Sequence, residues 1–141
     1  MDVRPISPNV WVSGQIQVED VAKLKDMGFR AIVGNRPDSE EPGQPDWVDI
    51  AAAAEAAGLA AAHIPVVPGQ IGDDQALAFR DVVTGFDKPV LAYCKTGTRA
   101  AQLWSLAARD RLSTDEVIRM AATAGYDLES MRARIEQGLA G

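Results

Sequence analysis

Short apolar runs alternate with longer amphipathic segments along most of the chain. Four runs have the length of strands, and they cover residues 9–13, 29–33, 59–67 and 89–93. Between and after them, apolar residues recur at helical spacing, which predicts helices over residues 18–27, 45–57, 73–86 and 100–111. Pro45 can start the second of these helices, and Asp73 is a candidate cap of the third. This alternation indicates a three-layer α/β fold, in which a mainly parallel sheet of four or five strands is flanked by helices.

The last part of the chain predicts a helical hairpin packed on this domain. Ser113 and Glu116 have the spacing of a capping box, in which each side chain accepts a hydrogen bond from the other residue's backbone N–H. A helix is therefore expected to begin here. Asp127 can cap a final helix over residues 128–137. Since no linker, repeat or low-complexity segment interrupts the pattern, we expect residues 1–141 to form a single domain.

Composition and charge narrow the classes of function. Fourteen Lys and Arg residues against twenty Asp and Glu residues give a net charge of −6. Such a chain repels phosphate, so we expect neither nucleic acid nor a membrane as a partner. The single cysteine excludes an intramolecular disulfide and a second, resolving thiol. The amino end lacks the apolar stretch of a signal peptide, and no apolar run approaches the ~20 residues of a membrane span, so a cytoplasmic protein is expected.

The loop over residues 94–99 carries the most reactive chemistry. Cys94 directly follows an apolar strand and precedes a helix, whose amino end favours an anion. Arg99 can hold an oxyanion through two hydrogen bonds, and Gly97 permits the positive φ of a tight loop. We therefore expect Cys94 to ionise more readily than an ordinary cysteine. The other residues of the loop are candidates for binding the same anion: Lys95, Thr96 and Thr98.

Loops after neighbouring parallel strands meet at one edge of a sheet, so they supply further candidates. Asn35 and Arg36 follow a strand, and anion binding is as good an interpretation as a turn cap beside a surface charge. Gln70 lies in a Gly-containing loop that could bring its amide to an oxyanion. His63 lies inside an apolar strand, which favours a structural role. The acidic stretches at residues 38–41 and 73–74 are typical of solvated loops. No cluster of side chains suggests a metal, and no cofactor is expected.

Four segments together resemble a bacterial family described as beta-lactamase hydrolase-like or phosphatase-like. They read Val12–Gln15, Asn35–Asp38, His63–Val66 and Tyr93–Arg99, and the resemblance extends over about residues 1–135. It implies the fold of dual-specificity phosphatases, with Cys94 as nucleophile and Arg99 as anion clamp. Members of the family are described as phosphatases or as sulfur transferases. Some occur fused or adjacent to persulfide dioxygenases, so a functional association with such an enzyme is one expectation.

Two departures from the phosphatase pattern bear on the reaction. Tyrosine and dual-specificity phosphatases place five residues between Cys and Arg, whereas this chain places four, as the rhodanese loop does. Their general-acid Asp has no counterpart in the segment over residues 66–70, and Tyr93 stands where their Cys is preceded by His. Sulfite leaves thiosulfate without an acid, so both departures favour sulfur chemistry.

The sequence therefore favours a sulfurtransferase. In this hypothesis, Cys94 takes sulfane sulfur from thiosulfate or a persulfide, and the Cys94 persulfide passes it to a thiol such as glutathione or to cyanide. A cysteine-dependent phosphatase that forms a Cys94 phosphoenzyme is the second hypothesis, with Asp38, Asp73 or Asp74 as its acid. A non-catalytic module that binds an anion or a protein is the third.

Overall fold

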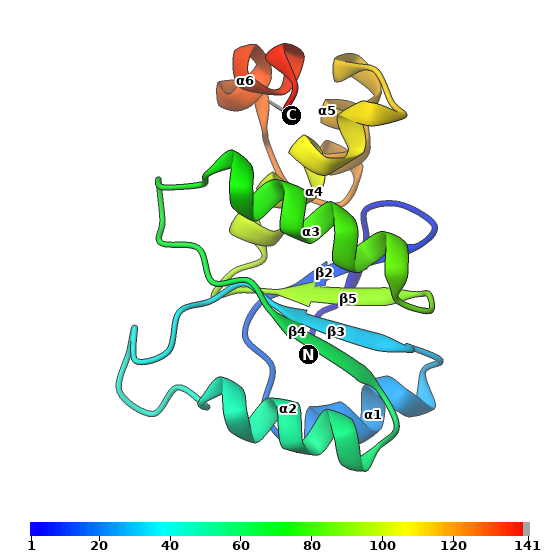
Figure 1. The fold of residues 1–141 in the computed structure, drawn as a ribbon, viewed down its shortest axis with the longest axis vertical. Helices are drawn as coiled ribbons and strands as arrows, with labels where there is room; N and C mark the ends of the chain where they lie inside the picture. The colour runs from blue at the N-terminus through cyan, green and yellow to red at the C-terminus, as the bar shows by residue number, and fades with distance from the viewer. Residues whose placement is uncertain (140–141) are drawn as a thin grey trace.

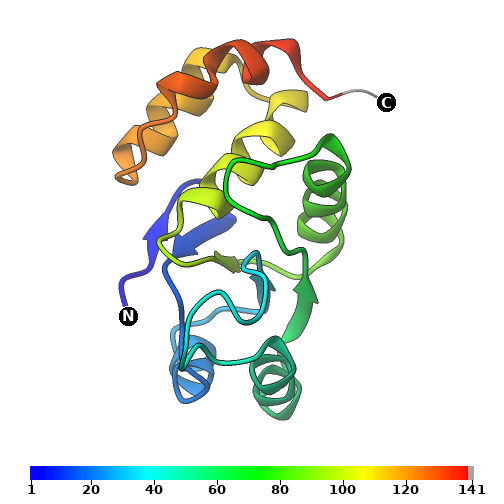
Figure 2. The ribbon, with the colours of Figure 1, turned by 90° about the vertical axis from the view of Figure 1, so that its left-hand side faces the viewer.

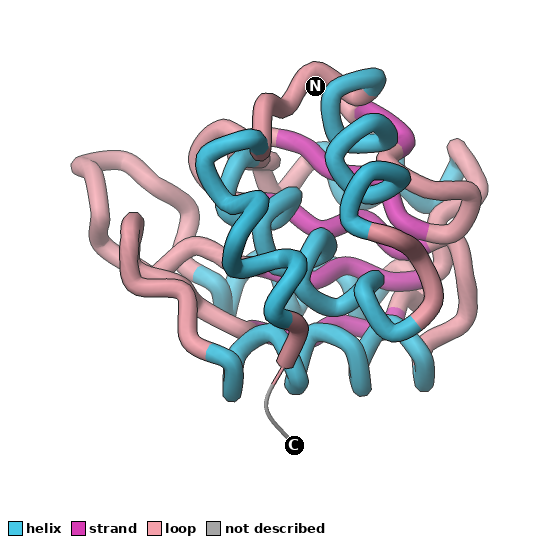
Figure 3. Tube along the Cα trace, turned by 90° about the horizontal axis from the view of Figure 1, so that it is seen from above, coloured by secondary structure: helices cyan, strands magenta, loops and turns pink. Residues whose placement is uncertain are grey.

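The computed structural model describes residues 1–139 and places a five-stranded sheet between two layers of helices (Figure 1). The strands are β1 (Arg4–Pro5), β2 (Val10–Ser13), β3 (Ala31–Gly34), β4 (Ala60–His63) and β5 (Val90–Tyr93). Their order in the sheet is β1-β2-β5-β3-β4. All neighbours pair in parallel except β1, which pairs antiparallel with β2. Figure 3 shows the strands side by side beneath the helices. The predicted mainly parallel sheet is confirmed.

Helices cover both faces of this sheet, and on one face two further helices form an outer layer. On one face lie α1 (Asp20–Asp26) and α2 (Trp47–Ala56); on the other lie α3 (Asp73–Gly85) and α4 (Thr98–Ala107). The predicted hairpin is formed by α5 (Thr114–Thr123) and α6 (Arg132–Gln137), which stack outside α4 (Figure 1). Two short 3-10 helices, η1 (Ala108–Asp110) and η2 (Glu129–Met131), precede α5 and α6. Within residues 1–139, no helix has both the length and the apolar character that crossing a membrane requires.

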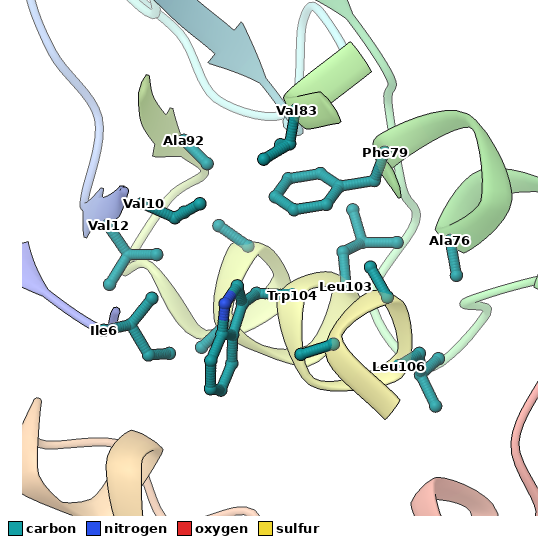
Figure 4. Close-up of a cluster of buried hydrophobic side chains, with 14 of the residues drawn as sticks. Ile6, Val10, Val12, Ala76, Phe79, Val83, Ala92, Leu103, Trp104 and Leu106 are labelled. Atoms are coloured by element: carbon teal, nitrogen blue, oxygen red, sulfur yellow. The ribbon is translucent and has the colours of Figure 1, made fainter. Parts of the chain in front are cut away.

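The continuous apolar runs of the strands follow from burial on both faces of the sheet. All four residues of β5 are buried, as are all four of β3. Side chains between the sheet and α3 and α4 form the larger cluster, in which Phe79 and Trp104 lie close to Val10 and Val83 (Figure 4). A second cluster lies between the sheet and α1 and α2. Both clusters bury apolar surface, which is the main source of stability for such a domain.

Several predicted boundaries differ from the structure for local reasons. Helix α2 begins at Trp47 after the extended residue Asp46, so the prediction that Pro45 starts this helix was wrong. Helix α3 follows an extended Gly72, so the assignment of Asp73 as its cap was also wrong. The Gly72 N–H donates instead to Oε1 of Gln75 at 2.7 Å. Strand β1 was not predicted, because two residues that include a proline carry no alternating pattern.

The hairpin follows its predicted signals more closely. Ser113 and Glu116 form the expected capping box at the start of α5, with both backbone N–H groups bound. Asp127 accepts a hydrogen bond from the Glu129 N–H at 3.0 Å, but the predicted single helix is divided into η2 and α6. The single domain over residues 1–141 stays a prediction, and its last two residues lie outside the described part of the chain.

Candidate active site

Cys94 lies at the carboxyl end of β5, which is the central strand of the sheet. Its N–H donates to the Ser13 carbonyl at 3.3 Å, and the Asn35 N–H donates to the Tyr93 carbonyl at 2.7 Å. These hydrogen bonds join the ends of β2, β3 and β5. The loops that follow these three strands therefore meet around Cys94, at the edge that faces the viewer in Figure 2.

The sulfur atom of Cys94 is buried against the start of α4. The cysteine is 1 % exposed, and its Sγ accepts a hydrogen bond from the Gly97 N–H at 3.1 Å. Gly97 has a φ of +94° and precedes the first residue of α4, so the chain turns back on the sulfur within four residues. The backbone N–H and the amino end of α4 both stabilise a negative charge on the sulfur.

Arg99 lies in the first turn of α4 and is held by three hydrogen bonds. Its Nη1 donates to Glu40 Oε2 at 2.8 Å and to the Val66 carbonyl at 2.7 Å, and its Nη2 donates to Glu40 Oε1 at 3.0 Å. Burial acts to lower the pKa of Arg99. The hydrogen bonds with Glu40 and the charge of the nearby Cys94 sulfur outweigh burial, so the pKa is raised. The guanidinium is thus a fixed cation beside the thiol.

The loop between β3 and α2 supplies the carboxylates that balance this charge. Glu40 also accepts from Arg36 Nε at 2.7 Å, so one carboxylate joins two guanidiniums. Glu41 forms ion pairs with Lys95 and, at 3.7 Å, with Arg36 Nη2. The hydrogen bond from Arg99 lowers the pKa of Glu40, burial opposes this, and the hydrogen bond from Arg36 lowers it further. The interpretation of residues 38–41 as a solvated acidic loop was therefore wrong for Glu40, whose side chain is 20 % exposed.

Other predicted residues of the Cys94 loop face outward. Lys95, Thr96 and Thr98 are exposed. The two threonine hydroxyls bind each other at 3.0 Å, and the Thr98 N–H reaches Oγ1 of Thr96 at 3.4 Å. Their contact with an anion stays a prediction. Within residues 1–139, none of these three side chains forms a hydrogen bond with Cys94 Sγ.

The candidates from neighbouring loops have different surroundings. Asn35 is fully buried, and its Nδ2 donates to the Ile64 carbonyl at 3.0 Å. It therefore links the segment after β3 to the segment after β4. Arg36 is 5 % exposed and bound to Glu40 and to Oε1 of Gln15. Gln70 is exposed in the turn that begins at Val67, and its side chain forms no hydrogen bond or ion pair within residues 1–139. Anion binding by these three residues stays a prediction.

His63 has the structural surroundings that its position in an apolar strand favours. Its Nε2 lies 3.0 Å from the Arg36 carbonyl, and its ring stacks on Trp47 with centroids 5.0 Å apart. Among residues 1–139, no group of three or more His, Cys, Asp and Glu side chains has a geometry that could hold a metal ion.

The carboxylates considered as acids are engaged elsewhere or lie outward. Asp38 Oδ1 accepts the Trp47 N–H at 2.8 Å, at the start of α2. Asp73 forms an ion pair with Arg134 at 2.9 Å, and Asp74 is exposed on the first turn of α3. The structure therefore shows none of them in contact with the Cys94 loop.

Several residues that contact the Cys94 loop were not predicted to do so, among them Glu40 and Glu41. In addition, Gln15 donates its N–H to the Lys95 carbonyl at 3.2 Å, and the Tyr126 hydroxyl donates to the Thr96 carbonyl at 3.3 Å. The position of Gln15 in a loop at the shared edge was a signal that could have found it. Tyr126 lies 30 positions beyond Thr96, and no local pattern connects the two.

Residues 2–110 match the model of a family described as beta-lactamase hydrolase-like protein, phosphatase-like domain. A beta-lactamase hydrolase-like protein of Agrobacterium fabrum is 36 % identical over 125 residues. That alignment covers 87 % of this chain but 29 % of the relative, so the chain spans less than a third of the relative's length.

Two solved structures have the same fold over nearly the whole chain. A candidate phosphatase from Neisseria meningitidis Z2491 is 35 % identical, with a TM-score of 0.85 over 97 % of this chain and 98 % of that one. The core catalytic domain of a PP-IP phosphatase from S. cerevisiae is 12 % identical, with a TM-score of 0.71 over 98 % of this chain and 85 % of that one. At that identity the second likeness shows the fold alone.

Proposed function

The chain belongs to the phosphatase-like domain family of beta-lactamase hydrolase-like proteins, and on that premise we propose that it is a cysteine-dependent phosphatase. The observation that carries the proposal is the position of Cys94 Sγ, 3.1 Å from the Gly97 N–H at the amino end of α4. Arg99 lies in the first turn of the same helix as a buried cation. A thiolate nucleophile beside donors for oxyanions is the arrangement that phosphoryl transfer to cysteine requires.

The proposed reaction has two steps. In the first, the Cys94 thiolate attacks the phosphorus atom, and the S–P bond forms as the bond to the leaving oxygen breaks. Arg99 and the N–H groups of the loop bind the phosphoryl oxygens, and the leaving oxygen takes a proton from solvent. In the second step, water attacks phosphorus and gives up a proton. The S–P bond then breaks, so that inorganic phosphate leaves and the thiolate is restored.

The surrounding carboxylates restrict the class of substrate. Arg99 and Lys95 hold Glu40 and Glu41 as carboxylates, since hydrogen bonds from these cations lower the pKa of each. Neither is suited to protonate a leaving group near neutral pH. The proposal therefore favours phosphate esters whose leaving groups need no acid, such as aryl phosphates.

Sulfur transfer from thiosulfate is the second candidate, because only four residues separate Cys94 from Arg99. None of the relatives described above is named as a sulfurtransferase, so the first hypothesis of the sequence analysis lacks their support. The thiosulfate or persulfide donor, the thiol acceptor and the link to a persulfide dioxygenase belong to this second candidate and stay predictions.

A comparison of the purified protein with Cys94→Ser tests the proposal. The substrates are p-nitrophenyl phosphate in one assay, and thiosulfate with cyanide in the other. We expect phosphate release by the unchanged protein and a loss of about a thousandfold or more in the variant, because a serine hydroxyl is a much weaker nucleophile near neutral pH.

The matched control is Ser130→Ala, an exposed serine in η2, which should keep the full rate. If thiocyanate forms in a Cys94-dependent reaction and no phosphate is released, the proposal of a phosphatase is wrong and the sulfurtransferase is favoured. Equal phosphate release by the Cys94→Ser variant would contradict a reaction through a Cys94 phosphoenzyme.

A further inference from the structure

One peptide unit of the Cys94 loop is bound from both sides. Its N–H group belongs to Gly97 and donates to Cys94 Sγ at 3.1 Å. Its carbonyl group belongs to Thr96 and accepts the Tyr126 hydroxyl at 3.3 Å. Because the C=O and N–H of a trans peptide lie in one plane and point in opposite directions, Tyr126 and the sulfur bind opposite edges of the same peptide unit.

Tyr126 also packs closely on the loop. A Cβ atom added to Gly97 would lie 2.1 Å from the Tyr126 hydroxyl oxygen. Gly97 is thus required twice, once for its φ of +94° and once for the room that Tyr126 takes up. The half-buried phenol leaves the Thr96–Gly97 peptide little freedom to rotate away from Cys94.

Neighbouring segments hold Tyr126 in this place. Arg4 on β1 donates from Nη1 to the Ala124 carbonyl at 3.3 Å, and it fills the space beside Gly125. The turn after α5 is thereby held near the sheet, and Figure 2 shows this turn beside the start of α4. The match to the family model ends at residue 110, so Tyr126 comes from the hairpin beyond it.

We infer that Tyr126 is a positioning residue, which orients the Thr96–Gly97 peptide so that its N–H stabilises the Cys94 thiolate. A hydrogen bond to a carbonyl polarises the whole peptide and makes its N–H a better donor, as in other hydrogen-bond chains. Burial, and then the charge of Cys94, raise the pKa of Tyr126. The hydroxyl therefore keeps its proton and remains a donor at neutral pH.

This inference rests on Cys94 as the nucleophile of the proposed phosphatase, but it can be tested without turnover. The rate of alkylation by iodoacetamide, measured against pH, reports the ionisation of Cys94 directly. Apart from the phenol of Tyr126 itself, the charged or titratable groups around the sulfur and its loop are the same in every variant compared: Asp2, Arg4, Glu40, Glu41, Lys95 and Arg99.

In Tyr126→Phe the ring stays and the hydroxyl is lost. Polarisation adds roughly 10–30 % to a hydrogen bond, so we expect the midpoint of alkylation to rise by about half a pH unit and the rate at pH 7 to fall about threefold. The plateau at high pH should stay unchanged, because the fully ionised thiolate is the same nucleophile. In ¹H–¹⁵N spectra, the amide proton of Gly97 should move upfield as its hydrogen bond weakens.

Ser113→Ala is the matched control, because it removes the cap of α5 in the same hairpin without touching the loop. It should leave the alkylation midpoint unchanged. An unchanged midpoint in folded Tyr126→Phe would overturn the inference, and so would an equal shift in Ser113→Ala, since hairpin stability would then explain the effect. No phosphate release by the unchanged protein, together with the expected shift in Tyr126→Phe, would instead count against the proposed function and leave the inference intact.

Discussion

At the scale of single residues, Glu40 shows how a cationic site can be buried. Arg36 and Arg99 are 5 % and 7 % exposed, and two guanidiniums at such depth require a counter-charge. Glu40 supplies it through hydrogen bonds to both, at 2.7 to 3.0 Å. The carboxylate therefore fixes the orientation of Arg99 before any substrate arrives, which lowers the entropic cost of binding an anion.

Replacing Glu40 by Gln should destabilise the protein at neutral pH. The change leaves Arg99 without its carboxylate and Arg36 with only the longer ion pair to Glu41, which costs about 2–3 kcal/mol of unfolding free energy, somewhat below the range for fully buried pairs. The pKa of Glu40 is lowered in the folded state. The contribution of Glu40 to stability is therefore fully present when the pH is above its pKa in the unfolded chain. It is lost as the pH falls through its lower pKa in the folded protein.

Denaturant unfolding of Glu40→Gln between pH 3 and pH 7 checks this prediction. The difference from the unchanged protein should be largest at pH 7 and should narrow under acidic conditions. Glu55→Gln is the matched control, because Glu55 is exposed on α2 and its side chain forms no ion pair within residues 1–139. A constant difference across the whole pH range would show that charge is not the cause.

At the scale of elements, the positions of Arg99 and Tyr126 depend on where α4 and α5 begin. Helix α4 begins at Thr98, two residues before the predicted start, so Arg99 belongs to its first turn and not to the loop. The N–H groups of this turn and the guanidinium are thereby held by one rigid element. The start of α5 follows the capping box of Ser113 and Glu116, and this helix carries the chain to Tyr126.

Ser113→Ala should weaken the hairpin without changing the site. The loss of the bond from the Glu116 N–H to Ser113 Oγ, at 3.2 Å, is expected to cost about 1 kcal/mol of stability. Thermal unfolding measures this loss as a lower Tm. Ser130→Ala, at an exposed serine in η2, should leave the Tm unchanged. An unaltered Tm in Ser113→Ala would mean that the hairpin does not depend on its cap.

At the scale of the whole molecule, the two buried clusters pack the helices against the sheet and so fix the position of the helices relative to the edge where Cys94 lies. Phe79 of α3 is fully buried in the same cluster as Leu103 and Trp104 of α4 (Figure 4). Arg99 lies on that helix too. Element order, the parallel sheet and most of the core could be predicted, because they follow from the period of apolar positions. Strand β1 could not, since its pairing with β2 is visible only in the folded chain.

Phe79→Ala should destabilise the whole domain. A fully buried Phe that is cut back to Ala typically costs about 3–5 kcal/mol, because the core loses apolar contacts and a cavity remains. Denaturant unfolding measures the cost. Val48→Ala, at a site that is 68 % exposed, should change the stability by less than about 0.5 kcal/mol. A loss in Phe79→Ala as small as in this control would contradict the role given to the cluster.

The sequence by itself determined the order of elements and the place of Cys94 between a buried strand and a helix. Both depend on residues a few positions apart, where periodicity, capping and turn chemistry act. Only the tertiary structure decided what surrounds the nucleophile. Glu40 reaches Arg99 across 59 positions, and Tyr126 reaches Thr96 across 30. Such contacts form when loops of separate strands and a distant hairpin meet, so local patterns do not record them.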